Sequence, residues 1–211
     1  MHTALALLLF VPAWSLHFWQ AWLYWSLSTV AALATTFYFL KHDRALMERR
    51  LEVGARAEPL QSQQYIQGIG GALVCLIYVI AGVEHRIHAT PVPTPVVLAA
   101  DLLVLASFAL TFRVFNENTF TAATIKVEPG QSVIATGPYA RVRHPMYTAA
   151  MIGFLAAPLA LGSRWALIPA ALLCATIVAR LLDEERHLRE NLPGYAAYCR
   201  KVRARLIPRV W

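Results

Sequence analysis

Five apolar stretches set the strongest limit on how this chain of 211 residues can fold. A hydrocarbon core of about 30 Å requires about 20 mostly apolar residues in a helix. Stretches of this kind run at about residues 19–40, 64–84, 95–115, 145–161 and 164–182. Because 58% of the residues are hydrophobic and 15% are charged, the composition excludes a soluble domain. We predict an all-α fold, an integral membrane helical bundle with about five transmembrane helices.

The boundary between the last two stretches is short. They meet at Gly162 and Ser163, so we expect a helical hairpin. At the other end of the chain, residues 3–13 form an apolar run that looks like the core of a signal peptide. No Lys or Arg precedes that run and no clean small-residue cleavage site follows it, which favours a retained anchor or a half-length helix.

The distribution of basic residues predicts the orientation. Segments 41–63, 113–144 and 180–211 hold five, four and eight Lys or Arg residues, 17 of the 19 in the chain. Under a five-span topology these segments share one side, which the positive-inside rule assigns to the cytoplasm. The net charge of +7 therefore flanks membrane spans, and this excludes nucleic acid as the partner and favours membrane lipids.

Two common kinds of site have no signature in the sequence. The three cysteines show neither CxxC nor Cys/His ligand spacing, so we expect no metal. A GIGG cluster, Gly68 to Gly71, lies in an apolar stretch without a preceding strand. It lacks the context of a soluble nucleotide-binding loop, and we expect these glycines to serve helix packing.

Polar residues concentrate in GPYARVRHPMY, from Gly137 to Tyr147, between two apolar stretches. Gly137 and Pro138 indicate a turn. Pro145 suits the first turn of a helix, where its missing N–H has no cost. The loop should therefore bring Arg143 and His144 to a helix N-terminus at the membrane surface, where unpaired N–H groups favour a carboxylate.

A second polar group closes the following apolar stretch. Arg180 and Glu184 are four residues apart, so they share one helix face, whereas Glu185 points elsewhere. An arginine at a helix end can also extend to the headgroups, but the nearby loop rich in His and Tyr favours a site. Such a site could bind a cationic and an anionic group side by side.

Other polar residues have weaker functional indications. Asp101 lies inside the third stretch, towards Glu84 and His85 in this topology, and we expect structural pairing there. Asn116 to Asn118 could equally be a helix stop or a wall of the site. Tyr195 and Tyr198 should lie on a short surface helix after Pro193, where they could cover a ligand, and the basic tail should lie on anionic lipid.

These motifs together resemble the isoprenylcysteine carboxyl methyltransferase family. The residues concerned are RHPMY, then R-x-x-x-E-E-x-x-L from Arg180 to Leu188, then PGYAAY and a basic segment that ends in RLIP. The resemblance covers about residues 113–211 and implies a membrane enzyme, related to phospholipid methyltransferases, that uses S-adenosylmethionine and releases S-adenosylhomocysteine. Residues 1–112 match only in general character. We treat residues 1–211 as one membrane domain, with N-terminal helices in 1–112 and a methyltransferase-like cofactor pocket in 113–211.

The resemblance also assigns roles to residues. It implies that Arg180 orients an acceptor carboxylate and that Glu184 holds the cofactor. The other cofactor-binding residues that it implies are Lys126, Gln131, Ser132, Val133, Ile134, Tyr139, His144, Pro145, Met146 and Tyr147.

The chemistry of methyl transfer agrees with these roles. An in-line displacement at a sulfonium needs alignment and exclusion of water, and a carboxylate acceptor needs no strong base. Arg180 suits a carboxylate better than an amine, because an amine would face a second cation. We therefore expect transfer to a lipophilic or lipid-like acceptor, most favourably to oxygen, with the catalytic face and the C-terminus of this multi-pass protein in the cytoplasm. Two alternatives are a membrane reductase with a nicotinamide cofactor and a non-catalytic membrane protein or transporter.

Overall fold

The structure is a computed structural model that describes residues 2–51, 58, 61–88, 92–120 and 132–211. Throughout these residues the secondary structure is helical, without a strand, which confirms the predicted all-α fold. The helices are α1 (His2–Ala13), α2 (Trp19–His42), α3 (Arg44–Leu51), α4 (Gln61–Arg86), α5 (Thr94–Glu117), the 3-10 helix η2 (Gly137–Ala140), α6 (Pro145–Ala160), α7 (Leu167–Asn191) and α8 (Tyr195–Lys201).

Three helices of the described chain, α2, α4 and α5, are long and apolar enough to cross a membrane. They coincide with the first three predicted stretches. The helix α6 has 16 residues, and α7 has 25 residues but ends in a charged segment. The membrane bundle is thus established, whereas the count of five spans stays a prediction.

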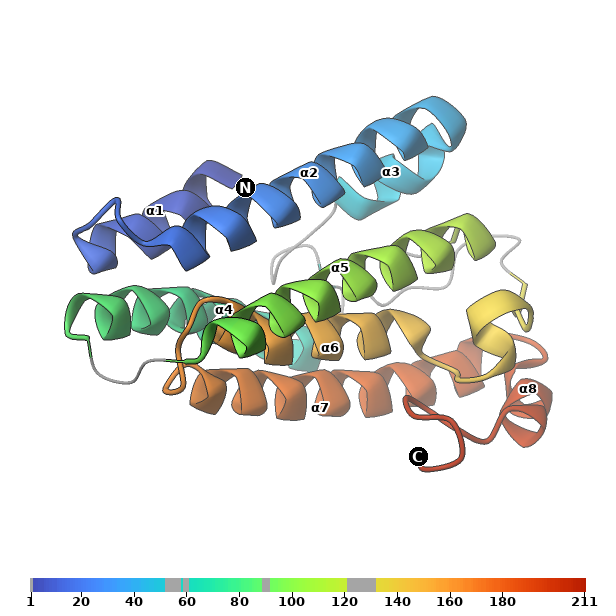
Figure 1. The fold of residues 1–211 in the computed structure, drawn as a ribbon. Helices are drawn as coiled ribbons and strands as arrows, with labels where there is room; N and C mark the ends of the chain where they lie inside the picture. The colour runs from blue at the N-terminus through green and yellow to red at the C-terminus, as the bar shows by residue number, and fades with distance from the viewer. Residues whose placement is uncertain (1, 52–57, 59–60, 89–91, 121–131) are drawn as a thin grey trace.

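The bundle has two chemically different ends (Figure 1). One end, here named the polar end, holds the end of α5, η2, the start of α6, the end of α7, and α8. The opposite end, here named the turn end, holds the α1–α2 connection, the end of α4 and the α6–α7 turn. The predicted hairpin is present between α6 and α7, and Gly162 adopts the left-handed conformation (φ +69°) that such a turn requires.

Glu84, from α4, fixes this hairpin. Its carboxylate is buried and accepts hydrogen bonds from the Ser163 hydroxyl at 2.5 Å and from the Trp165 N–H at 3.0 Å. The Arg164 N–H lies 3.3 Å from the other carboxylate oxygen. These three donors hold the turn against α4.

The structure contradicts the prediction that Asp101 pairs with a neighbouring polar side chain. Its side chain is 3% exposed, and within the described residues neither carboxylate oxygen has a hydrogen-bond partner. It lies among buried apolar residues of α5, including Ala100 and Val104, which offer no donor.

The half-length helix predicted at residues 3–13 is present as α1, which packs on α4. Gly82 permits this contact, because a Cβ atom there would lie 2.6 Å from the Leu9 carbonyl oxygen. The packing role predicted for the GIGG cluster is correct only for Gly70, which faces Leu173 on α7. Gly68 and Gly71 show no such packing, because a Cβ atom there would meet no atom of the described residues within 4 Å.

Candidate active site

The predicted motif builds the polar end of the bundle. Gly137 begins η2 with a φ of +54° and lies against the Glu117 side chain, which also accepts a hydrogen bond from Thr136. His144 is the N-cap residue of α6 and Pro145 follows as the first residue of that helix, as predicted. The loop therefore delivers Arg143, His144 and Tyr147 to one place.

Glu185 is the centre of a buried ion-pair cluster. One carboxylate oxygen lies 2.7 Å from Nε of Arg143 and 3.2 Å from Nε2 of His144. The other lies 3.1 Å from Nε of Arg205 and 3.7 Å from Arg189. These five residues are called the Glu185 cluster below.

The charges in this cluster stabilise one another. Burial by itself raises the pKa of Glu185, but the hydrogen bonds and charges of His144 and Arg143 outweigh it and bring the pKa to about 2. Burial lowers the pKa of Arg143, and Glu185 more than offsets this, so that pKa is raised. Both residues are therefore charged at neutral pH.

Backbone contacts give the Glu185 cluster a structural role. Nη1 of Arg143 donates to the carbonyl oxygens of Val202 and Arg203 at 2.9 and 2.8 Å. The N–H groups of Arg143 and His144 donate to the carbonyls of Ala204 and Arg205, both at 3.0 Å. The cluster thus joins the C-terminal segment to the start of α6 and to α7.

Glu184, the preceding residue, belongs to a different set of contacts. The Tyr147 hydroxyl donates to Oε2 of Glu184 at 2.6 Å and accepts from Nε of Arg180 at 3.1 Å. Arg180 also donates to Oε1 of Gln63 at 2.9 Å and to Oε1 of Glu58 at 2.6 Å. These five residues are called the Glu184 cluster below.

Glu58, just before α4, and Gln63, in its first turn, complete the Glu184 cluster. The side chain of Glu58 is fully buried and accepts a hydrogen bond from Nε2 of Gln67 at 3.2 Å. Gln63 is also fully buried, and its amide donates to Asp183. The ion pair of Arg180 is therefore made with Glu58, across 122 positions in the sequence, rather than with Glu184 one turn away.

Tyr139, on η2, lies beside the Glu184 cluster. Its hydroxyl accepts from Nδ2 of Asn118 at 3.2 Å, and its carbonyl accepts from the Tyr198 hydroxyl at 2.7 Å. Burial raises the pKa of Tyr139 to about 12, so the hydroxyl stays protonated. Asn118 is both the C-cap residue of α5 and a wall of this region.

The tyrosines of α8 face inwards. Tyr195 and Tyr198 are buried with Leu192 and Val202, and the Tyr195 hydroxyl lies 3.5 Å from Nε2 of His144. Tyr195 therefore adds to the wall around the Glu185 cluster.

The remaining predicted site residues occupy several places. Val133 packs on the Tyr195–Tyr198 cluster, whereas Met146 packs on Phe115 and Leu46 at the other side of α6. Ser132 is exposed and Ile134 is half-buried. Lys126 and Gln131 lie outside the described residues. The structure thus groups Tyr139, His144, Tyr147, Arg180 and Glu184 at the polar end. Pro145 begins α6 there, and Met146 lies on a different face of that helix.

Sequence reasoning missed Glu58, Gln63 and the central role of Glu185. The polar QSQQ run, residues 61–64, at the start of an otherwise apolar helix was an available signal for Gln63. The four-residue spacing of Glu185 and Arg189 was a signal that Glu185 has cationic partners.

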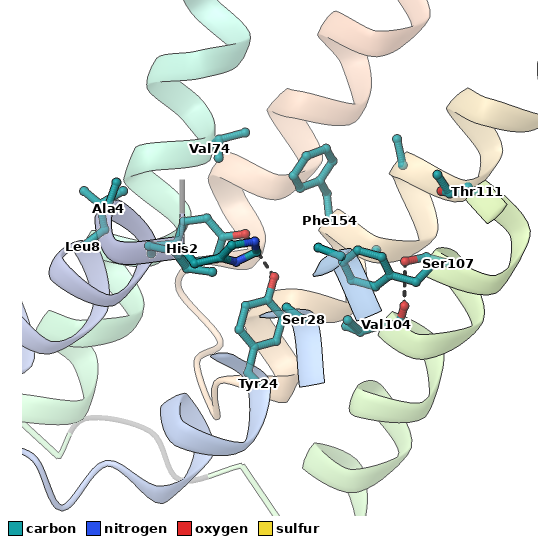
Figure 2. A pocket seen from close by; sticks show the side chains of 17 residues that line it. His2, Ala4, Leu8, Tyr24, Ser28, Val74, Val104, Ser107, Thr111 and Phe154 are labelled. Atoms are coloured by element: carbon teal, nitrogen blue, oxygen red, sulfur yellow. Dashed lines mark hydrogen bonds between the residues drawn. The ribbon is translucent and has the colours of Figure 1, made fainter. Parts of the chain in front are cut away.

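An apolar cavity of about 450 Å³ lies between the helices. Side chains from α1, α2, α4, α5 and α6 converge on it (Figure 2). Ala150 and Phe154 line the cavity and lie three and seven residues after Tyr147, so all three share one face of α6. Further along, a hydrogen bond of 3.0 Å joins the hydroxyls of Tyr24 and Tyr78. A volume of this size suits the apolar part of a small lipophilic molecule.

Comparison with known proteins agrees with this geometry. No curated protein matches the chain. Residues 96–193 match the family model described as phospholipid methyltransferase, which confirms the predicted relation to phospholipid methyltransferases. The narrower assignment to the isoprenylcysteine carboxyl methyltransferases stays a prediction. The match spans all but the first two residues of α5 and the whole of η2, α6 and α7. It therefore contains both clusters apart from the residues supplied by the α4 region and the C-terminal segment. Residues 96–193 are therefore similar to the phospholipid methyltransferase family, and this similarity supports a membrane methyltransferase.

Proposed function

We propose that the protein is an S-adenosylmethionine-dependent methyltransferase whose acceptor partitions into the membrane. The observation that carries the proposal is the Glu184 cluster, whose residues Tyr147, Arg180 and Glu184 lie within the matched family region. Tyr147 lies one turn of α6 before Ala150, which lines the apolar cavity. The cofactor would supply an electrophilic methyl group. The acceptor atom would supply the electron pair of the new bond to that carbon as the C–S bond breaks, and the pair of the broken bond would remain on sulfur. The protein residues would supply alignment and exclusion of water.

The donor set at this site fits such a cofactor. In the described chain, Oε2 of Glu184 accepts from Tyr147 and its other oxygen has no hydrogen-bond partner, so the carboxylate retains capacity for an ammonium or a ribose hydroxyl. The first turn of α6 presents backbone N–H groups of Met146 and Tyr147 that helix geometry leaves without intrahelical partners. Anionic and donor groups thus lie side by side.

The acceptor should be a lipophilic small molecule or lipid with its reacting atom near Tyr147 and its apolar part in the cavity. Transfer to a carboxylate oxygen is the predicted preference, with Arg180 as the orienting residue. That carboxylate would need to displace Glu58 from Arg180 or share the guanidinium with it, because Glu58 lies 2.6 Å away. We further propose that the polar end faces the cytoplasm, since 17 of the 19 Lys and Arg residues flank that side in the predicted topology.

Isothermal titration in detergent tests the cofactor. Wild-type protein should bind S-adenosylhomocysteine with a micromolar dissociation constant, and Glu184→Ala should bind it at least about 10-fold more weakly, the loss of one charge-assisted contact. His144→Ala should also weaken binding, because it removes a partner of Glu185 at the start of α6. Glu190→Ala, an exposed acid on the same helix, is the matched control and should bind normally. Folded protein that binds a nicotinamide cofactor instead would support a reductase.

Labelled cofactor with a total lipid extract tests the acceptor. We expect a labelled lipophilic product, and base-labile methyl esters would support an oxygen acceptor. Folded protein that binds S-adenosylhomocysteine but labels no component of the extract would count against a membrane-partitioned acceptor.

A further inference from the structure

Arg50, at the end of α3, lies near the Glu184 cluster but outside the matched family segment, residues 96–193. Its guanidinium carbon lies 4.5 Å from the ring centroid of Phe115. Phe115 belongs to a buried cluster with Phe39 and Leu46, on which Met146 of α6 packs. The helix α3 therefore places a cation beside the first turn of α6.

No acidic side chain of the described residues compensates the charge of Arg50. The side chain is half-buried, and within the described residues it has no ion pair and no hydrogen bond to an acidic side chain. Burial lowers its pKa, and the groups that act in the opposite direction are the hydroxyls of Tyr139 and Tyr147. Partial burial of a cation has a desolvation cost, and a bound anion would offset that cost.

The other arginine of the region cannot fill this role as readily. Arg180 already contacts Glu58, Gln63 and Tyr147. Its positive charge is balanced at 2.6 Å by the Glu58 carboxylate. A ligand anion would compete with Glu58 at Arg180, whereas at Arg50 it would meet no acidic competitor from the described part of the chain.

Tyr139 lies near both the Glu184 carboxylate and the Arg50 guanidinium, because both groups act on it electrostatically. Glu184 and Arg50, one anionic and one cationic, thus both lie close enough to Tyr139 and Tyr147 to interact with them electrostatically. The amino-acid end of S-adenosylmethionine is a zwitterion, with an ammonium and a carboxylate on one carbon. The two side chains complement its two charges.

We propose that Arg50 binds the carboxylate of the cofactor's amino-acid end while Glu184 binds its ammonium. This role rests on the proposed function. It assigns to α3, in the N-terminal half of the chain, a part of the cofactor site. Arg50 forms charge-assisted hydrogen bonds to the carboxylate while its guanidinium remains stacked on Phe115.

A comparison of two ligands isolates the carboxylate contact. S-Adenosylhomocysteine has both charged groups, whereas its decarboxylated analogue has the ammonium alone. Titration should show that Arg50→Gln weakens binding of S-adenosylhomocysteine about 10- to 100-fold, the loss of affinity expected when charge-assisted hydrogen bonds are removed. Binding of the decarboxylated analogue should change less than about 3-fold, since that ligand never contacts Arg50. Arg50→Lys keeps the charge and should give an intermediate loss for S-adenosylhomocysteine.

The control is Arg44→Gln on the same helix, because the Arg44 side chain is 79% exposed and pairs only with Glu48 among the described residues. It should bind both ligands as the wild type does. Equal weakening of both ligands in Arg50→Gln and Arg50→Lys would overturn the proposal in favour of a packing role on Phe115. Unchanged binding of S-adenosylhomocysteine in Arg50→Gln would also overturn it. Wild-type protein that binds neither ligand would instead overturn the proposed function itself.

Discussion

Glu184 and Glu185 are consecutive residues of α7, yet one faces a site with remaining binding capacity and the other faces a closed ionic network. Glu185 is 3% exposed, and its oxygens are shared among four cationic or histidine side chains and thereby hold the C-terminal segment. Glu184 is half-buried and accepts one hydrogen bond, from Tyr147. The difference shows that satisfaction of hydrogen-bonding capacity, more than charge, separates a structural acid from a ligand-binding one.

The largest effect should come from removal of the Glu185 carboxylate. Glu185→Ala leaves the buried Arg143 charge uncompensated, and loss of one partner of a buried pair costs about 3–5 kcal/mol. Unfolding in mixed detergent micelles would measure the loss of stability. Glu184→Ala, the neighbouring substitution, should cost less than half as much. Equal losses would contradict the division into a structural and a ligand-binding acid.

The pH dependence of stability should follow from the same contacts. The pKa of Glu185 is lowered from 4.5 to about 2, so its contribution is full above pH 4.5 and is lost as the pH falls towards 2. A shift of this size corresponds to about 3 kcal/mol. Thermal unfolding from pH 6 to pH 2 should show this loss in the wild type and a flatter curve in Glu185→Gln. Parallel curves for the two proteins would show that other groups dominate acid unfolding.

Much of the fold was predictable because its determinants are local. Apolar length defines α2, α4 and α5, and Pro145 defines the start of α6 within its own turn. The contact between Tyr147 and Glu184 was accessible through the family motif, since both residues lie in it.

The rest depends on distant parts of the chain. The Glu58–Arg180 pair spans 122 positions, and no local pattern indicates that an acid before α4 reaches α7. Successive helix residues differ by about 100° in direction, and the sequence of α7 does not say whether Glu184 or Glu185 meets Arg143. The stacking of Arg50 on Phe115 likewise depends on how α3 folds back along α2.

Removal of single hydroxyl groups compares the two clusters with a smaller perturbation. Tyr147→Phe removes the group that both donates to Glu184 and accepts from Arg180, which should cost about 1–2 kcal/mol. Tyr195→Phe removes only a long contact of 3.5 Å to His144 and should cost less than about 0.5 kcal/mol. Unfolding of both variants under the same conditions gives the comparison. A larger loss in Tyr195→Phe would show that the Glu185 cluster depends on that hydroxyl.

The smallest change in stability should come from Glu184→Gln. The amide oxygen can still accept the Tyr147 hydroxyl at the position where Oε2 lies 2.6 Å away, so the unfolding free energy should change by less than about 1 kcal/mol. The negative charge proposed to meet the cofactor's ammonium is nevertheless lost. Addition of S-adenosylhomocysteine should therefore raise the melting temperature of the wild type and leave that of Glu184→Gln nearly unchanged, because a ligand stabilises only the folded state that binds it. Equal thermal shifts in the two proteins would place the ammonium elsewhere, and a loss of stability comparable with that of Glu185→Ala would make Glu184 a structural residue as well.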